Sequence, residues 1–290
     1  MRDSILADDL GPRGRRQVLI GSIVAGVLLL AFLGVGIKRF SDNGQFAEDK
    51  WRPLTQWSVL KFYLGGLGNT LKAAGAAMVI ALIIGGLVAL ARLARTAPVR
   101  WLATLYVEFF RGMALYLLIL FCWLGLPRLG VRLDVYWYLV IGLSVYNSAV
   151  LAEVFRAGIL SLDRGQGDAA AALGMRYWQS MGLVIVPQAV RRMLPAIISQ
   201  LVTLLKDTSL GVLIFYEELL RRARLSAEFF HNPVMSVALV ALVYIAVNAT
   251  LSQVATRLEA RARRRYQAGT LQVTGMEQLA VVGAQADAAT

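Results

Sequence analysis

The chain has 290 residues, of which 58% are hydrophobic and only 17% are charged, and its mean hydropathy is +0.60. This balance excludes an ordinary soluble domain, whose surface must face water, and favours a protein that lies in a membrane. The net charge of +12 does not indicate nucleic acid as a partner, because the arginines flank apolar runs rather than alternate with stacking aromatic residues. The single cysteine, Cys122, cannot form a disulfide within the chain and fits a buried thiol.

Six apolar runs are long enough to cross the roughly 30 Å hydrocarbon core of a bilayer as helices. Backbone groups in hydrocarbon must bond to one another, and these runs are too long and too uniformly apolar for the strands of a barrel. We therefore predict an all-α membrane protein with six transmembrane helices. The runs are residues 18–37, 66–90, 102–124, 135–155, 193–215 and 234–256.

The first run could instead be a secretory signal, because Arg13, Arg15 and Arg16 precede it. No small-residue cleavage site follows and the run is long, so an uncleaved anchor is the preferred interpretation. The predicted organisation is a cytoplasmic segment, a helix with an external loop, a transmembrane domain, and a basic and then disordered tail. These parts span residues 1–17, 18–65, 66–256 and 257–290.

The distribution of basic residues predicts the orientation. With both termini in the cytoplasm, 17 of the 30 Lys and Arg residues lie inside and 10 lie outside. The positive-inside rule therefore favours a multi-pass protein of the cell membrane with both termini cytoplasmic. Residues 217–230 are the exception, because they place three arginines on the outer side. Three glutamates accompany these arginines, which predicts a short amphipathic helix on the membrane surface.

A spaced motif lies between the fourth and fifth runs. It reads Asp168-Ala169-Ala170, three residues, Gly174, nine residues, and then Val184-Ile185-Val186-Pro187. Alanine favours helix, an acidic residue in the first turn complements the helix dipole, and Gly174 fits a left-handed C-terminal cap. Composition alone would allow any short turn between helices, but the full spacing through Pro187 argues against that.

This spacing resembles the pattern E-A-A, three residues, G, nine residues, I-x-L-P of the cytoplasmic coupling loop in ABC importer permeases, here residues 156–190. The polar amino acid branch of that family, with its glutamate, aspartate, histidine and arginine transporters, is similar over further segments, and actinobacterial glutamate permeases are the most alike. These segments are YVEFFRG from Tyr106, AEVFRAG from Ala152, GMRYW from Gly174, PQA from Pro187 and LKDTSL from Leu205.

The resemblance implies a type I importer fold, with a core of five helices plus one extra N-terminal helix. One departure stands out, since this chain has Met113-Ala114 where the family has Thr-Pro. The loss of that proline is expected to straighten the third helix.

The resemblance also implies partners. A cytoplasmic ATPase dimer would receive the coupling loops, a second permease chain would complete the pore, and an extracytoplasmic binding protein would deliver an amino acid. The sequence contains no G-x-x-x-x-G-K-[ST] motif, so we expect a transport subunit rather than an enzyme, with no cofactor of its own and with ATP and Mg on the partner ATPase. The residues expected to couple to the ATPase are Gly165, Asp168, Ala169, Ala170, Gly174 and Pro187.

Polar and ionisable side chains inside the runs are candidates for the translocation pathway, because they are costly in lipid. Lys206 is the deepest cation and could compensate an anionic substrate, but ion pairing between helices is an equal alternative. Asn147 could line the path or bond across helices. The full candidate set is Lys206, Asp207, Asn147, Glu108, Arg111 and Glu153.

Two other classes remain open. A secondary transporter or channel for a small polar solute would explain six spans and buried charges, but not a coupling loop at this spacing. A membrane anchor would fit the topology but not the charges within the spans. No metal site is expected, because the lone His231 lies in an external loop without partners.

Overall fold

The computed structural model describes residues 11–254, 256 and 257, and every regular element within them is a helix. The long elements are α1 (Pro12–Asp42), α3 (Trp57–Arg92), α4 (Ala97–Gly112), α5 (Leu115–Arg128), α6 (Val135–Leu160), α9 (Val186–Asp207) and the last helix (Pro233–Val254). The short elements are α2 (Glu48–Trp51), η1 (Arg52–Thr55), α7 (Arg164–Ala172), α8 (Tyr177–Ser180), the π-helical η2 (Met181–Ile185), the 3₁₀-helical η3 (Thr208–Ile214) and α10 (Leu219–Phe230). The predicted tail beyond residue 257 and the first ten residues lie outside the described residues.

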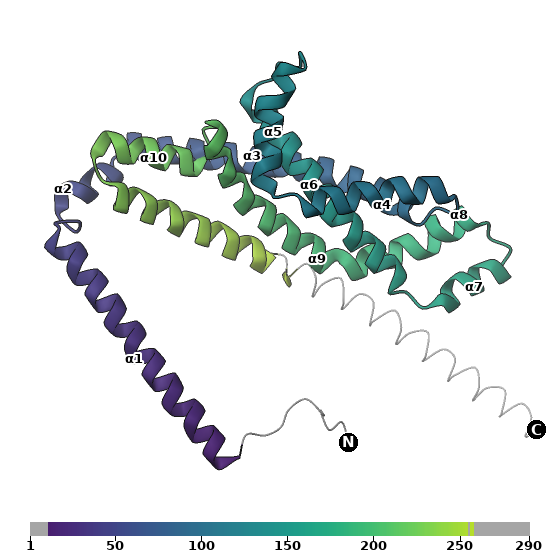
Figure 1. Cartoon of the computed structure of the whole chain (residues 1–290), viewed down its shortest axis with the longest axis horizontal. Helices are drawn as coiled ribbons and strands as arrows, with labels where there is room; N and C mark the ends of the chain where they lie inside the picture. Colours follow the sequence, from purple (N-terminus) through teal and green to yellow (C-terminus); the bar gives the residue numbers. More distant parts are fainter. Residues whose placement is uncertain (1–10, 255, 258–290) are drawn as a thin grey trace, which may run out of the picture.

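The predicted all-α membrane architecture is confirmed. Five helices have the length and composition to cross a membrane, and the α4–α5 pair gives a sixth span if it is counted as one bent span. The expectation of a straightened third helix is wrong, because α4 and α5 meet at an angle of 101°. Met113 and Ala114 adopt extended backbone, with ψ values of 139° and 126°, and so interrupt the helix without a proline. Figure 1 shows α5 projecting from the bundle.

Two other helices begin earlier in the chain than the spans predicted from the sequence. α3 begins at Trp57 rather than at residue 66, and the expected external loop contains the end of α1 together with α2 and η1. The fifth span runs back to Tyr177 through the π-helical η2. Pro187 has no N–H to donate to the carbonyl four residues earlier, and the wider turn lies directly before it, with the Val186 N–H bonded to the Met181 carbonyl.

A seam of small residues on α3 packs against α6. The side chains recur every four residues, which places them on one helix face, and all are nearly or fully buried. A Cβ atom at Gly85 would lie only 2.8 Å from the Ser148 carbonyl oxygen of α6. Such small residues let two backbones approach closely, which is how helices associate in lipid. The seam consists of Ala73, Ala77, Ala81, Gly85 and Ala89.

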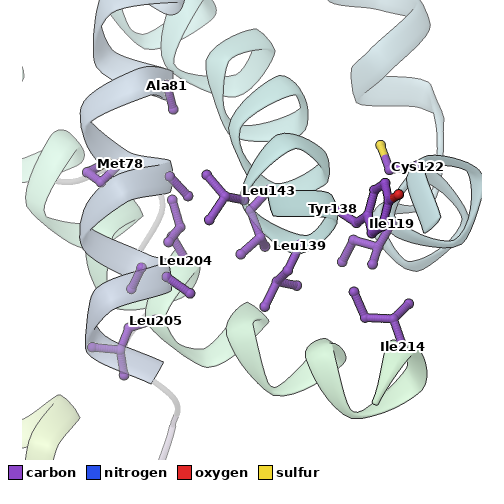
Figure 2. Close-up of a cluster of buried hydrophobic side chains, with 14 of the residues drawn as sticks. Met78, Ala81, Ile119, Cys122, Tyr138, Leu139, Leu143, Leu204, Leu205 and Ile214 are labelled. Atoms are coloured by element: carbon purple, nitrogen blue, oxygen red, sulfur yellow. The ribbon is translucent and has the colours of Figure 1, made fainter. Parts of the chain in front are cut away.

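The main apolar core lies beside this seam. Figure 2 shows Leu139 and Leu143 of α6 with side chains of α3 and α9 on one side and Ile119 of α5 on the other. Leu139, Leu143 and Leu204 are fully buried. α6 is therefore the central helix of the bundle, and α3, α5 and α9 are positioned against it.

The N-terminal helix α1 is apolar around its whole circumference and exposed along its length. None of its most hydrophobic 18-residue window is buried, and Leu30 and Phe32 are 70% and 76% exposed. In Figure 1 this helix runs away from the bundle. A helix that is hydrophobic on every face and unpacked within its own chain suits a lipid environment.

A helix is confirmed in the predicted segment 217–230, as α10, and it is anchored by a carboxyl group that the sequence analysis did not single out. Glu218 is fully buried and caps α10, accepting hydrogen bonds from the backbone N–H groups of Leu220 (2.7 Å) and Arg221 (2.6 Å). The Tyr244 hydroxyl of the last helix also donates to it at 3.0 Å. The Leu219 N–H bonds to Thr70 of α3 at 3.1 Å, so α10 is held between α3 and the last helix.

Replacing Gly85 by alanine tests the seam. The added methyl group would clash with a backbone carbonyl that cannot rotate away, at a cost of about 1–3 kcal/mol. We expect a lower thermal unfolding midpoint in detergent. Gly75→Ala is the matched control, because a Cβ there has nothing within 4 Å and alanine improves helix propensity by up to about 1 kcal/mol. Equal midpoints for the two variants would contradict the close approach.

The Glu218 carboxyl predicts a pH dependence of stability. Burial raises its pKa from the ordinary 4.5 to about 7, although its hydrogen bonds act in the opposite direction. The folded state therefore holds the proton more tightly than the unfolded chain. Its contribution to stability is greatest below pH 4.5, falls as the pH rises toward about 7, and is constant above that.

Thermal unfolding of the wild type and of Glu218→Gln between pH 5 and 8 checks this prediction. The variant keeps a neutral group at this position, so its midpoint should fall less over this interval than that of the wild type. Glu217→Gln is the control, since the Glu217 side chain is 59% exposed. Parallel pH profiles for the wild type and Glu218→Gln would count against a proton held at Glu218.

Candidate functional site

The connection between α6 and α9 forms a capped helix, α7, as the motif predicts. Its N-terminal cap is Asp163, whose side chain accepts a hydrogen bond of 2.9 Å from the Gly165 N–H. The expectation that Asp168 serves the first turn is wrong, because Asp168 is the fifth residue of α7 and the helix has no acidic residue in its first turn. Asp163 supplies the negative charge at the helix start instead.

The end of α7 confirms the predicted left-handed cap. Gly174 has φ of +77°, which a side chain would strain. Its N–H bonds to the Ala171 carbonyl at 2.9 Å, and the Met175 N–H bonds to the Ala170 carbonyl at 3.1 Å. This pair of bonds is the Schellman motif, which satisfies the last carbonyls of the helix and turns the chain sharply.

Three contacts tie the loop to the transmembrane helices. Gln188 of α9 donates to Gln166 of α7 at 3.0 Å, and the Arg192 guanidinium donates to the Ser161 carbonyl at 2.7 Å. The Arg95 guanidinium, just after α3, lies 5.1 Å from the centre of the Tyr177 ring. The sequence analysis missed these pairs, because residues so far apart in the chain give no spacing signal. These three contacts, the braces of α7, hold the chain before, within and after the helix.

The loop presents an exposed surface beyond the bundle. Asp168 and Ala169 are exposed, while Ala170 faces inward at 3% exposure, and Pro187 is the second residue of α9. Leu173 is 83% exposed and Trp178 is 64% exposed. In Figure 1, α7 lies at one end of the bundle and α10 at the other. A small exposed helix with apolar residues at its end is suited to docking another protein.

Glu153 lies at the centre of a cluster of charges at the same end. It pairs with Arg92 of α3 and accepts hydrogen bonds of 2.6 and 3.2 Å from Arg156. Arg111 of α4 approaches it at 3.9 Å, and Glu108 lies 3.9 Å from Arg92. These side chains join α3, α4 and α6 through ion pairs, which is the alternative left open by the sequence. Arg92 and Arg156 are the members of the cluster that the candidate set does not contain.

Asn147 is fully buried and bonds across helices. Its amide nitrogen donates to the Leu143 carbonyl at 2.8 Å, and its oxygen accepts a hydrogen bond of 2.6 Å from Gln200 of α9. This polar pair fixes α9 against α6. Of the two roles considered for Asn147, this geometry is that of an interhelical bond.

Lys206 lies in the last turn of α9 and is exposed. It lines a groove of about 320 Å³ between α9 and the last helix. Asp207 follows it and is partly buried, but it does not line the groove. The structure thus separates the candidate pathway residues: Glu108, Arg111 and Glu153 lie together near the loop, whereas Lys206 faces open space.

Comparison with known proteins identifies the family to which this architecture belongs. Residues 77–264 match the family described as the inner membrane component of binding-protein-dependent transport systems. The glutamate transport system permease protein GluD of Corynebacterium glutamicum is 37% identical over 77% of this chain and 83% of its own length. The glutamate/aspartate import permease protein GltK of Escherichia coli O157:H7 is 35% identical, over 70% of this chain and 94% of its own.

The fold agrees with this assignment. A crystal structure of an amino acid ABC transporter with histidines superposes with a TM-score of 0.68 and 29% identity, covering 72% of this chain and 97% of that one. The family model covers well over half of the chain, and the relatives match along most of their own length. The chain therefore belongs to the permease family that forms the inner membrane component of binding-protein-dependent ABC importers.

Proposed function

We propose that this chain is the permease subunit of an importer for a polar amino acid, with glutamate as the expected substrate. The observation that carries the proposal is the capped and braced helix α7, which extends beyond the transmembrane bundle with its coupling-loop residues in place. The similarity of the chain to glutamate permeases supports the choice of substrate. The chain moves solute and performs no covalent chemistry.

We infer the rest of the machine from this role. A cytoplasmic ATPase dimer binds α7 and holds ATP and Mg, so this chain needs no cofactor. A second permease chain, the same or a homologous one, faces the open groove beside Lys206, and an extracytoplasmic binding protein delivers the amino acid. Both termini are then cytoplasmic, which puts α7 inside and α10 outside.

Coupling is mechanical. When the ATPase dimer closes, it moves α7, and the braces at Gln188, Arg192 and Arg95 carry that movement into α9, α6 and the α3–α4 connection. A loop without these contacts could move without shifting the helices. The rigid caps at both ends of α7 serve the same purpose.

Reconstitution tests the function. The chain, purified with its co-expressed ATPase and any second permease, is placed in proteoliposomes with the binding protein outside and ATP inside. We expect uptake of glutamate that requires ATP and the ATPase subunit. A panel of glutamate, aspartate, glutamine and arginine checks the substrate. Uptake by the chain alone, without ATP, would support a secondary transporter instead.

Gly174→Leu tests the coupling loop. A side chain in the left-handed conformation costs about 1–2 kcal/mol and should disturb the end of α7 where the ATPase docks. We expect normal membrane insertion, with reduced ATPase co-purification or transport per ATP hydrolysed.

Gly130→Leu is the matched control for this variant. Gly130 has φ of +86° and ends α5 with the same pair of hydrogen bonds. Its N–H donates to the Pro127 carbonyl, and the Val131 N–H donates to the Leu126 carbonyl. The Gly130→Leu variant has the same backbone strain, but at a position outside the loop, so transport per ATP hydrolysed should stay at the wild-type value. If both variants were equally uncoupled, a general loss of stability would replace the coupling role of Gly174.

A further inference from the structure

An apolar groove lies between the first turns of α3 and the C-terminal half of α10. Its volume of about 420 Å³ is within the range for small-molecule sites, roughly 300–1,000 Å³. The residues that line it are uncharged, and Phe229 is 78% exposed at its edge. The shape and the lining suit an aliphatic chain. The apolar wall consists of Val59, Phe62, Leu225, Phe229 and Phe230.

Two buried donors at this junction have no hydrogen-bond partner within the described residues. They are the Nε of Arg222 and the hydroxyl of Ser226, a residue that is only 5% exposed. Four residues separate them, so their side chains are neighbours on one face of α10. Ser226 lines the groove, and the Arg222 guanidinium lies 4.7 Å from the centre of the Phe62 ring in its wall. A buried donor without an acceptor is costly, which indicates that a ligand oxygen belongs here.

The Arg222 side chain is held in a fixed orientation. One terminal nitrogen donates to the Phe62 carbonyl of α3 at 2.6 Å, and the other donates to Glu217 at 3.3 Å. The Glu217 side chain is 59% exposed, so the solvent screens its charge from a bound anion. A guanidinium that is already oriented loses little freedom when it binds a phosphate oxygen.

Aromatic residues place the groove at the level of the lipid headgroups. Trp57 is the first residue of α3 and is 72% exposed, and Trp51 at the end of α2 is 39% exposed. Tryptophan is enriched at the interface between membrane and water. Lys61, one turn after Trp57, is also exposed, and lysine near the end of a span extends toward the headgroups. The groove therefore lies where phosphate groups and the first methylene groups of lipids are found.

We propose that this groove binds one phospholipid, with a phosphate oxygen on Arg222 and Ser226 and one acyl chain along the aromatic wall. The phosphate supplies the acceptor that the two donors lack, and the chain covers the exposed face of Phe229. The bound lipid contacts both α3 and α10 and so strengthens their attachment. This site goes beyond the proposed transport function, because it involves neither the coupling loop nor the substrate.

Native mass spectrometry of the purified chain with its co-purifying subunits tests the site. The delipidated protein is titrated in detergent with dioleoyl phosphatidylglycerol, and the affinity for the tightest-bound lipid is measured. We expect Phe229→Ala to weaken binding about tenfold, because it removes much of the apolar wall. Phe121→Ala is the matched control, since Phe121 of α5 is 64% exposed and lies outside the groove, and it should bind lipid like the wild type.

Two further measurements test the phosphate contact. Ser226→Ala removes one donor and should weaken binding of phosphatidylglycerol about fivefold. The Ser226 hydroxyl has no partner within the described residues, so the thermal midpoint of this variant without lipid should match that of the wild type. Dioleoylglycerol has the same chains and no phosphate, and the wild type should bind it about tenfold more weakly.

Wild-type affinity in Phe229→Ala or Ser226→Ala would overturn the site, as would equal affinity for the two lipids. If Phe229→Ala kept its lipid affinity and lost the stimulation of ATP hydrolysis by the binding protein, the groove would be a protein-docking surface instead. Thermal midpoints show that the variants are folded. Because lipid binding is measured without transport, a failure here leaves the importer function untouched.

Discussion

The close approach of α3 to α6 is the constraint on which the rest of the structure depends. Lipid gives two apolar helices no hydrophobic reason to associate, so contact between their backbones has to supply the attraction. The small residues from Ala73 to Ala89 make that contact possible, and Gly85 leaves no room for a side chain. Because α6 is held there, its other faces are free to position α5 and α9.

Polar contacts then fix what packing alone would leave free to slide. The Asn147–Gln200 bond sets α9 against α6, and the Glu153 cluster joins α3, α4 and α6 near the coupling loop. These bonds matter mainly because they set the relative position of the helices, since apolar surfaces in lipid can slide past one another. Two of the contacts that hold the α7 loop, those of Gln188 and Arg192, also come from α9, so the loop is connected directly to the bundle.

Two carboxyl groups hold elements of the described structure together. Glu153 and Glu218 are satisfied by several partners and act as structural joints. Lys206 differs, because it lies in a groove whose other residues carry no charge.

Hydropathy and local spacing determined the helical class, the approximate spans, α10 and the cap at Gly174, because each depends on a few neighbouring residues. The break at Met113 and Ala114 escaped the sequence, since neither residue is a recognised helix breaker and the bend is set by the packing of α4 and α5 on α6. The sequence also suggested Asp168 for the first turn of α7, whereas the helix begins earlier and is capped by Asp163. Only the tertiary structure decided which charges are paired and which face of α9 is open, because those contacts join residues far apart in the chain.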